Sequence, residues 1–162
     1  MNTRKLTASA MFVSLGVVLG NLIYIPVGVS KCFPIQHTIN ILSAIVLGPF
    51  YSTIIAFLIS LIRNILGTGS LLAFPGSMIG AFLAGIIYKK TENKYLTAIG
   101  EVLGTGILGG LLAFPIAKYM MGKEVLAFFF VYPFILSTSG GAIMALILIK
   151  ILESMKEKQL SL

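Results

Sequence analysis

The side chains of this sequence that could bind a small molecule occur in short polar groups between long apolar stretches. Gln36, Asn40 and Ser43 stand at positions i, i+4 and i+7, and His37 precedes Asn40 by three positions. Residues with these spacings share one face of a helix. A face that carries amide, imidazole and hydroxyl groups can hydrogen-bond a small polar solute. The first prediction is therefore a ligand-binding face within residues 34–47.

Two more polar groups follow along the chain. Ser60, Arg63 and Asn64 share a helix face by their spacing, and the glycine-, serine- and proline-rich segment 67–77 comes directly after them. A third group lies within residues 132–139. Brought to one level, these groups would form a cavity with aromatic walls and few polar groups, as a small, weakly polar ligand requires. The predicted substrate-binding residues are Phe33, Gln36, His37, Asn40, Arg63, Asn64, Phe74, Ser77, Tyr132 and Ser137.

Each of these residues also has a structural interpretation. Arg63 could extend its charge to lipid headgroups, and His37 and Asn40 could pair with each other in helix packing. Ser137 could bond the backbone of its own helix, and the aromatic candidates suit the belts at the membrane surface. Glu101 is expected near the cytoplasmic start of its helix, where a carboxylate is stabilised by the helix dipole. The convergence of the polar groups, rather than any single residue, therefore carries the prediction of a binding site.

Catalytic, metal and cofactor sites are not indicated. The sequence has one cysteine, Cys32, one histidine and no aspartate, whereas zinc and iron–sulfur sites normally need three or four ligands. Residues 104–109 match the dinucleotide motif G-x-G-x-x-G, but that motif requires a preceding strand and a soluble βαβ unit. No phosphate-binding G-x-x-x-x-G-K-[ST] loop occurs. We therefore predict that the chain is not an enzyme and binds no metal and no cofactor. If the protein uses ATP, a partner chain must hydrolyse it.

The composition indicates which elements position these residues. Of 162 residues, 57% are apolar and only 10% are charged, whereas soluble domains contain about 25% charged residues. The net charge of +7 would suggest nucleic acid in a soluble protein, but in a membrane protein the basic residues are first assigned to the membrane surface. We therefore predict a multi-pass protein of the bacterial plasma membrane that binds no nucleic acid.

The hydrophobic pattern predicts an all-α membrane protein with a single integral domain over residues 1–162. Prolines and glycines divide it into six transmembrane helices. The predicted helices cover residues 6–25, 34–47, 51–66, 78–88, 95–117 and 125–152. Two of them are short for a 30 Å core, so a five-crossing alternative merges residues 34–66 into one kinked helix.

The distribution of basic residues favours six crossings with both termini in the cytoplasm. In that topology eight basic residues lie inside and four lie outside. The inner set is Arg4, Lys5, Lys89, Lys90, Lys94, Lys150, Lys156 and Lys158, and the outer set is Lys31, Arg63, Lys118 and Lys123. The same topology puts the predicted binding residues in the outer half of the membrane.

Small residues at four-residue spacing let membrane helices approach closely. The glycines within residues 100–110 are expected to serve internal packing. Near the N-terminus, Ala10 and Ser14 form one such pair and Gly16 and Gly20 another. For this first helix, internal packing and docking with another membrane protein both remain open.

Three segments resemble those of the substrate-binding (S) components of energy-coupling factor (ECF) vitamin transporters, and most closely the ThiW family. They are Pro34-Ile-Gln-His-Thr-Ile-Asn through Leu47-Gly-Pro-Phe-Tyr51, then 61–69 (Leu-Ile-Arg-Asn-Ile-Leu-Gly-Thr-Gly), and 74–80 (Phe-Pro-Gly-Ser-Met-Ile-Gly). The resemblance implies the six-helix S-component fold and ATP-driven uptake of a thiamine precursor, hydroxyethylthiazole. It also implies an ECF T subunit and two cytoplasmic ATPase subunits as partners in the lipid bilayer, with docking through the face of Ala10 and Ser14. In place of the Ala-xxx-Ala pattern common in this family, the sequence has Ala-xxx-Ser.

Three alternatives stay open from the sequence. The chain could be an S component for another vitamin-like solute, with Arg63 central if that solute is an anion. It could be a small ion-coupled carrier that works alone, or a membrane scaffold or intramembrane enzyme that transports nothing.

Overall fold

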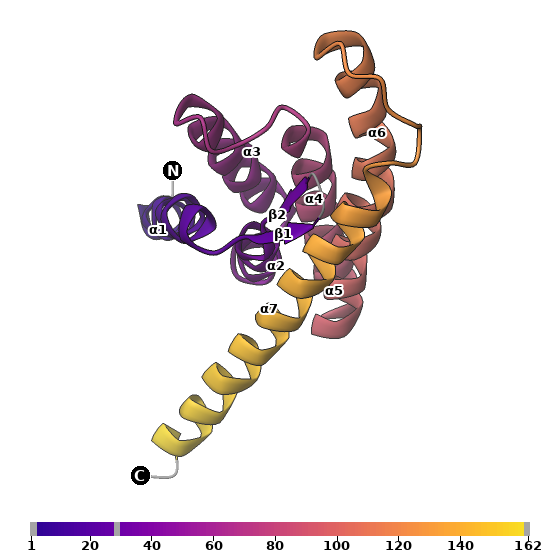
Figure 1. Cartoon of the computed structure of the whole chain (residues 1–162). Helices are drawn as coiled ribbons and strands as arrows, with labels where there is room; N and C mark the ends of the chain where they lie inside the picture. The colour runs from indigo at the N-terminus through magenta and orange to yellow at the C-terminus, as the bar shows by residue number, and fades with distance from the viewer. Residues whose placement is uncertain (1–2, 28–29, 161–162) are drawn as a thin grey trace.

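The computed structural model describes residues 3–27 and 30–160, and within these ranges the chain forms six helical rods and one short hairpin (Figure 1). Five rods are continuous α-helices. The remaining rod combines α-helical and π-helical segments end to end. The five α-helices are α1 (Thr3–Leu22), α2 (Pro34–Leu47), α3 (Pro49–Ile65), α4 (Ala73–Thr91) and α7 (Val131–Leu160). The composite rod consists of α5 (Lys94–Glu101), η1 (Val102–Gly109), α6 (Gly110–Pro115) and η2 (Ile116–Met120).

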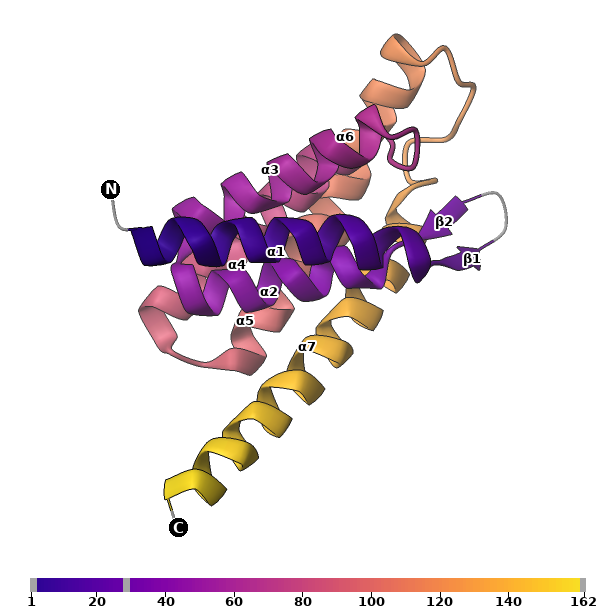
Figure 2. The same ribbon diagram turned by 90° about the vertical axis from the view of Figure 1, so that its left-hand side faces the viewer.

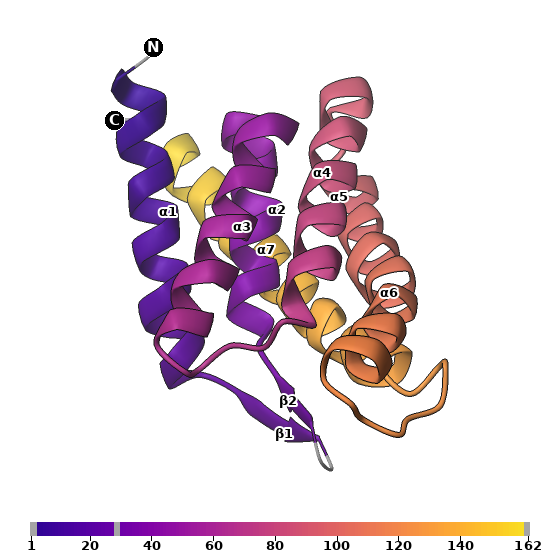
Figure 3. The ribbon, with the colours of Figure 1, turned by 90° about the horizontal axis from the view of Figure 1, so that it is seen from above.

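Successive rods run in opposite directions. Between α2 and α3 only Gly48 intervenes, with φ +85°, a conformation that glycine adopts without steric cost. Gln36 at the start of α2 bonds Ser60 near the end of α3, so the two helices pack antiparallel. The alternative of one kinked helix over residues 34–66 is therefore wrong. Both termini lie at one end of the bundle and the hairpin lies at the other (Figure 3).

Three of the rods are long and apolar enough to cross a membrane: Thr3–Leu22, Lys94–Met120 and Val131–Gln159. α2 and α3 are shorter apolar helices. With 14 residues, α2 is about 21 Å long at 1.5 Å per residue. It is buried along most of its length by the surrounding rods, so its polar residues are separated from lipid by protein.

The hairpin differs from the predicted helix and loop. α1 ends at Leu22, three residues before the expected end, and β1 (Ile25–Val27) pairs antiparallel with β2 (Ser30–Cys32). Figure 2 shows it beyond the end of α1. Pro26 cannot donate the backbone hydrogen bond that would continue a helix. The apolar residues beside it therefore pair as a strand, and β2 leads directly into α2.

Two other helices begin at residues that the sequence did not indicate. α4 begins at Ala73 instead of residue 78, because Pro75 lies in its first turn, where a missing N–H costs nothing. α7 begins at Val131 instead of residue 125. The chain before it, residues 121–130, forms irregular turns at the hairpin end of the bundle.

Glycines bring α4 and the composite rod into backbone contact. A Cβ built on Gly104 would lie 2.7 Å from Gly80 Cα, and one on Gly109 would lie 2.3 Å from Gly76 Cα. The glycines of residues 100–110 thus serve internal packing, as expected. Gly16 and Gly20 of α1 likewise face Ile59 and Arg63.

Alanine at Gly104 is expected to destabilise the bundle by about 1–3 kcal/mol, because its Cβ would meet backbone atoms that cannot move aside. The matched control is Gly140→Ala, whose Cβ would make only an ordinary 3.5 Å contact with Pro34. In detergent, the melting temperature of Gly104→Ala should be clearly lower than that of the unaltered chain, and the melting temperature of Gly140→Ala should not be lower. Equal melting temperatures would contradict this account of the packing.

Candidate functional site

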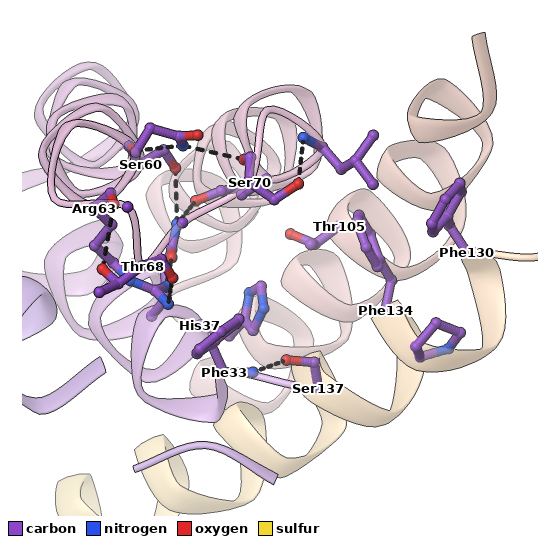
Figure 4. A pocket seen from close by; sticks show the side chains of 18 of the residues that line it. Phe33, His37, Ser60, Arg63, Thr68, Ser70, Thr105, Phe130, Phe134 and Ser137 are labelled. Atoms are coloured by element: carbon purple, nitrogen blue, oxygen red, sulfur yellow. Dashed lines mark hydrogen bonds between the residues drawn. The ribbon is translucent and has the colours of Figure 1, made fainter. Parts of the chain in front are cut away.

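A cavity of about 330 Å³ lies at the hairpin end of the bundle. It is bounded by the starts of α2, α4 and α7, the end of α3 and the composite rod. In Figure 4, Arg63, Ser60 and Thr68 lie on one side, Phe130 and Phe134 on the other, and His37 and Ser137 between them. The lining residues are Phe33, Gln36, His37, Ser60, Arg63, Asn64, Gly67, Thr68, Gly69, Ser70, Leu72, Ala73, Ser77, Thr105, Lys123, Phe130, Pro133, Phe134 and Ser137.

Arg63 joins three parts of the chain at the polar side of the cavity. Only 2% of its surface is exposed. Nη1 donates to Gln36 Oε1 at 2.7 Å, Nε to Asn21 Oδ1 at 3.3 Å, and Nη2 to the Thr68 carbonyl at 3.2 Å. Its guanidinium carbon lies 3.9 Å from the centre of the Phe33 ring, a cation–π contact. All these partners are uncharged, so the guanidinium is buried without a carboxylate in direct contact among the described residues.

Two buried amides extend this network into the bundle. Gln36 Nε2 donates to Ser60 Oγ and Ser77 Oγ, both at 2.9 Å. Asn40 Nδ2 donates to Ser77 Oγ at 3.2 Å and to Glu101 Oε1 at 3.0 Å. A continuous series of polar contacts therefore links the guanidinium of Arg63 to the carboxylate of Glu101.

Glu101 lies in the interior of the bundle rather than at a helix start near the membrane surface. It is fully buried, and its Oε1 lies 3.0 Å from His37 Nδ1. Thr105 Oγ1, also 3.0 Å away, completes the contacts of this oxygen. Glu101 lies seven residues beyond Lys94, the first residue of α5. The side chains that contact it belong to α2 and to the following turn of its own rod. The prediction that Glu101 stabilises the start of its helix is therefore wrong.

Gly80 of α4 makes room for this carboxylate. A Cβ at Gly80 would lie 2.5 Å from Glu101 Oε2 and 2.0 Å from Thr105 Oγ1. Glu101 Oε2 and Asn40 Oδ1 are buried, and neither has a hydrogen-bond partner within residues 3–27 and 30–160. The carboxylate of Glu101 therefore packs directly against the backbone of α4 at Gly80, and any side chain at position 80 would displace this carboxylate.

The loop between α3 and α4 is fastened over the cavity by backbone and side-chain contacts. Gly67 has φ +70°, which allows the chain to reverse. The amides of Thr68 and Gly69 both donate to the Arg63 carbonyl at 2.9 Å. Asn64 Nδ2 donates to the Ser70 carbonyl at 3.1 Å. Arg63 and Asn64 therefore shape the loop as well as line the cavity.

The opposite wall is mainly apolar. Phe130 and Phe134 lie with ring centroids 6.3 Å apart. Phe33 is held at the entrance to α2 by its amide, which donates to Ser137 Oγ at 2.8 Å. The preceding thiol of Cys32 donates to the Pro133 carbonyl at 3.3 Å, and burial raises the pKa of this thiol. The cavity thus combines aromatic surface with a polar side.

The structure brings most of the predicted site residues to this cavity. Those that line it are Phe33, Gln36, His37, Arg63, Asn64, Ser77 and Ser137. Asn40 lies behind the lining, against Ser77 and Glu101. Phe74 packs on Phe57 with ring centroids 5.7 Å apart, and Tyr132 is 69% exposed; neither reaches the cavity.

Several lining residues were not predicted. Phe130 and Phe134 stand in an apolar run and carry no spacing that distinguishes them from core residues. Thr105 lies among the packing glycines and Lys123 in the segment after η2. Ser60 shares the helix face of Arg63, and that pattern could have identified it. Among the described residues, no group of three potential metal ligands occurs.

Comparison with known proteins gives one family. The family model described as thiamine-precursor transporter protein (ThiW) matches residues 6–155, nearly the full chain. Neither curated proteins nor solved structures give a significant match. The bundle of apolar helices and its cavity of small-solute size agree with a membrane transporter. The chain therefore belongs to the ThiW family of thiamine-precursor transporter proteins.

Proposed function

We propose that this chain is the substrate-binding subunit of an ECF-type transporter and that its substrate is hydroxyethylthiazole. The cavity is the observation that carries the proposal. Its volume is at the lower end of the range of about 300–1,000 Å³ for small-molecule sites. Its aromatic wall suits a heteroaromatic ring, and its polar side suits a hydroxyl group.

The contacts of Arg63 favour an uncharged solute over an anion. Hydrogen bonds to Asn21, Gln36 and Thr68 use three of the five N–H donors of the guanidinium. Its charge is balanced through the polar network by Glu101, so no anionic ligand is needed to compensate it. Hydroxyethylthiazole is therefore preferred over its phosphate ester.

The arrangement of basic residues supports an orientation. The end of the bundle that holds both termini also carries Arg4, Lys5, Lys89, Lys90 and Lys94, which the positive-inside rule assigns to the cytoplasm. The cavity would then open towards the outer side. In this proposal an ECF T subunit and two cytoplasmic ATPase subunits drive the release of the solute on the inner side.

The test is calorimetric binding with the purified chain. It should bind hydroxyethylthiazole and should bind the phosphate ester and the pyrimidine half of thiamine at least about tenfold more weakly. Vesicles that contain only this chain should not accumulate the solute, whereas vesicles with the T and ATPase subunits should. Absence of thiazole binding with tight binding of another vitamin-like compound would overturn the substrate assignment.

A second candidate, an ion-coupled carrier that works alone, is favoured by one observation. Glu101 is a buried carboxylate in contact with His37, and proton-coupled carriers use such groups inside the membrane. Accumulation driven by a proton gradient in vesicles with this chain alone would support this candidate. The two candidates are therefore separated by the same vesicle experiment.

A further inference from the structure

The two ring nitrogens of His37 have different surroundings. Nδ1 contacts Glu101 Oε1 at 3.0 Å. Nε2 has no hydrogen-bond partner within the described residues, and the side chain retains 10% exposure while it lines the cavity. In Figure 4 the His37 ring lies between Phe33 and Thr105 at the cavity. Nε2 is therefore the atom through which this residue can meet a ligand.

The direction of the inner hydrogen bond follows from the other groups on Glu101. Asn40 Nδ2 can only donate, and it donates to Oε1 at 3.0 Å. Thr105 Oγ1 lies 3.0 Å from the same oxygen and 3.0 Å from the Gly76 carbonyl, so its one hydrogen is shared between two acceptors. Because Oε1 accepts from Asn40 as a carboxylate oxygen, His37 Nδ1 carries the hydrogen of the contact between them. In a neutral imidazole, Nε2 is then a bare acceptor.

The charges around the cavity agree with a neutral imidazole. Arg63 of α3 is balanced by Glu101 through Gln36, Ser77 and Asn40. Among the described residues that line the cavity, Lys123 is the other charged one. The thiol of Cys32 in β2 lies beside the cavity residue Pro133. α4 and α7 contribute uncharged hydroxyl groups to the lining. An imidazolium would share the single carboxylate of Glu101, which contacts His37 Nδ1 directly, with Arg63, and the site would then carry a net positive charge.

We propose that His37 Nε2 is a hydrogen-bond acceptor that selects solutes with an O–H or N–H donor, and that Glu101 is the positioning residue that fixes this tautomer. The inference rests on the proposed function and deepens it. It assigns to this site the alcohol group of the thiazole, rather than its ring nitrogen, which can only accept. An analogue that lacks the donor leaves Nε2 desolvated and unpaired.

The first experiment compares the alcohol with its O-methyl ether in calorimetric titrations of the purified chain. At about pH 8, the ether should bind about 10- to 100-fold more weakly, because a buried acceptor loses its partner. An analogue in which hydrogen replaces the hydroxyl group removes the donor without added bulk, and it should bind about as weakly as the ether. Comparing the two analogues separates the lost donor from the extra bulk of the methyl group.

The second experiment repeats these titrations with Glu101→Gln. A glutamine amide can donate to Nδ1 as well as accept from it, so the tautomer is no longer fixed and the preference for the alcohol should fall several-fold. The ratio of the two affinities is measured on the folded fraction alone, and a loss of folded protein therefore leaves it unchanged. Ser52→Ala is the matched control, because it removes a buried hydrogen bond to Ala81 away from the cavity.

Equal binding of the alcohol and of the analogue that lacks the hydroxyl group would overturn the inference and leave the proposed function intact. A preference for the alcohol that persists unchanged in Glu101→Gln would overturn the role of Glu101. Absence of alcohol binding in the unaltered chain would instead overturn the proposed function. The failures of the two proposals are thus distinguishable.

Discussion

Replacing Arg63 with glutamine is expected to destabilise the protein by about 3–5 kcal/mol, because it removes a buried cation and leaves the acceptors of its three hydrogen bonds unpaired. Arg63 and Glu101 are both almost completely buried. The change also breaks the contacts that hold α1, α2 and the α3–α4 loop together. The melting temperature in detergent should fall by about 10 °C, and the affinity for hydroxyethylthiazole should fall as well.

Charge balance is tested by the double variant Arg63→Gln/Glu101→Gln. If the two charges compensate each other, the double variant should be at least about 1 kcal/mol more stable than the sum of the single losses predicts. The control pair combines Arg63→Gln with Ser52→Ala. Ser52 bonds Ala81 and Pro49 and contacts neither charge, so these losses should add. Additive losses in both pairs would show that the polar network does not couple Arg63 to Glu101.

The polar faces of α2 and α3 were predictable because they depend on local spacing. Gln36 and His37 on α2, and Arg63 and Asn64 on α3, follow helical periodicity, and these side chains meet at the cavity. A six-rod helical bundle was also predictable from the apolar runs and their breaks. Local sequence patterns thus identify which faces carry polar groups and how many rods the chain forms.

The partnership of His37 with Glu101 was not predictable in the same way. It joins residues 64 positions apart and depends on how closely α4 approaches the composite rod. That approach is possible because Gly80 faces Gly104 and leaves room for the carboxylate. A local pattern shows that glycines line a face, but the charged group that fills the space left by a missing Cβ emerges only from packing.

The hairpin and the aromatic wall show the same limit for apolar residues. Ile25 and Val27 are apolar residues that would also suit the end of a helix, and only the antiparallel pairing of residues 25–27 with residues 30–32 identifies the strand. Phe130 and Phe134 resemble any membrane-facing phenylalanines in sequence. Their place at the cavity depends on the starting point of α7, which lies six residues beyond the predicted start at residue 125.

In the transporter proposed above, phenylalanine at Ala10 is expected to reduce uptake at least about tenfold while leaving the folded protein intact. Ala10 and Ser14 are both exposed on α1. Ser14 Oγ donates to the Ala10 carbonyl at 2.9 Å, so the hydroxyl needs no partner outside its own helix. Both side chains are small, and a neighbouring helix can approach this face closely. Gly16 and Gly20 face Ile59 and Arg63 inside the bundle. α1 therefore uses one set of small residues internally and leaves the other exposed, where the proposed function predicts that a partner helix docks.

The measurement compares three properties of Ala10→Phe in vesicles with the T and ATPase subunits. Thiazole binding and thermal stability should match those of the unaltered chain, because the new ring points away from the bundle. Uptake should fall at least about tenfold, because a bulky ring prevents close helix approach. Leu103→Phe is the control: Leu103 is 48% exposed on the composite rod, where the same ring should meet lipid and leave uptake unchanged. Normal uptake by Ala10→Phe would show that the partner docks elsewhere, and equal losses in both variants would show that added bulk rather than this face is responsible.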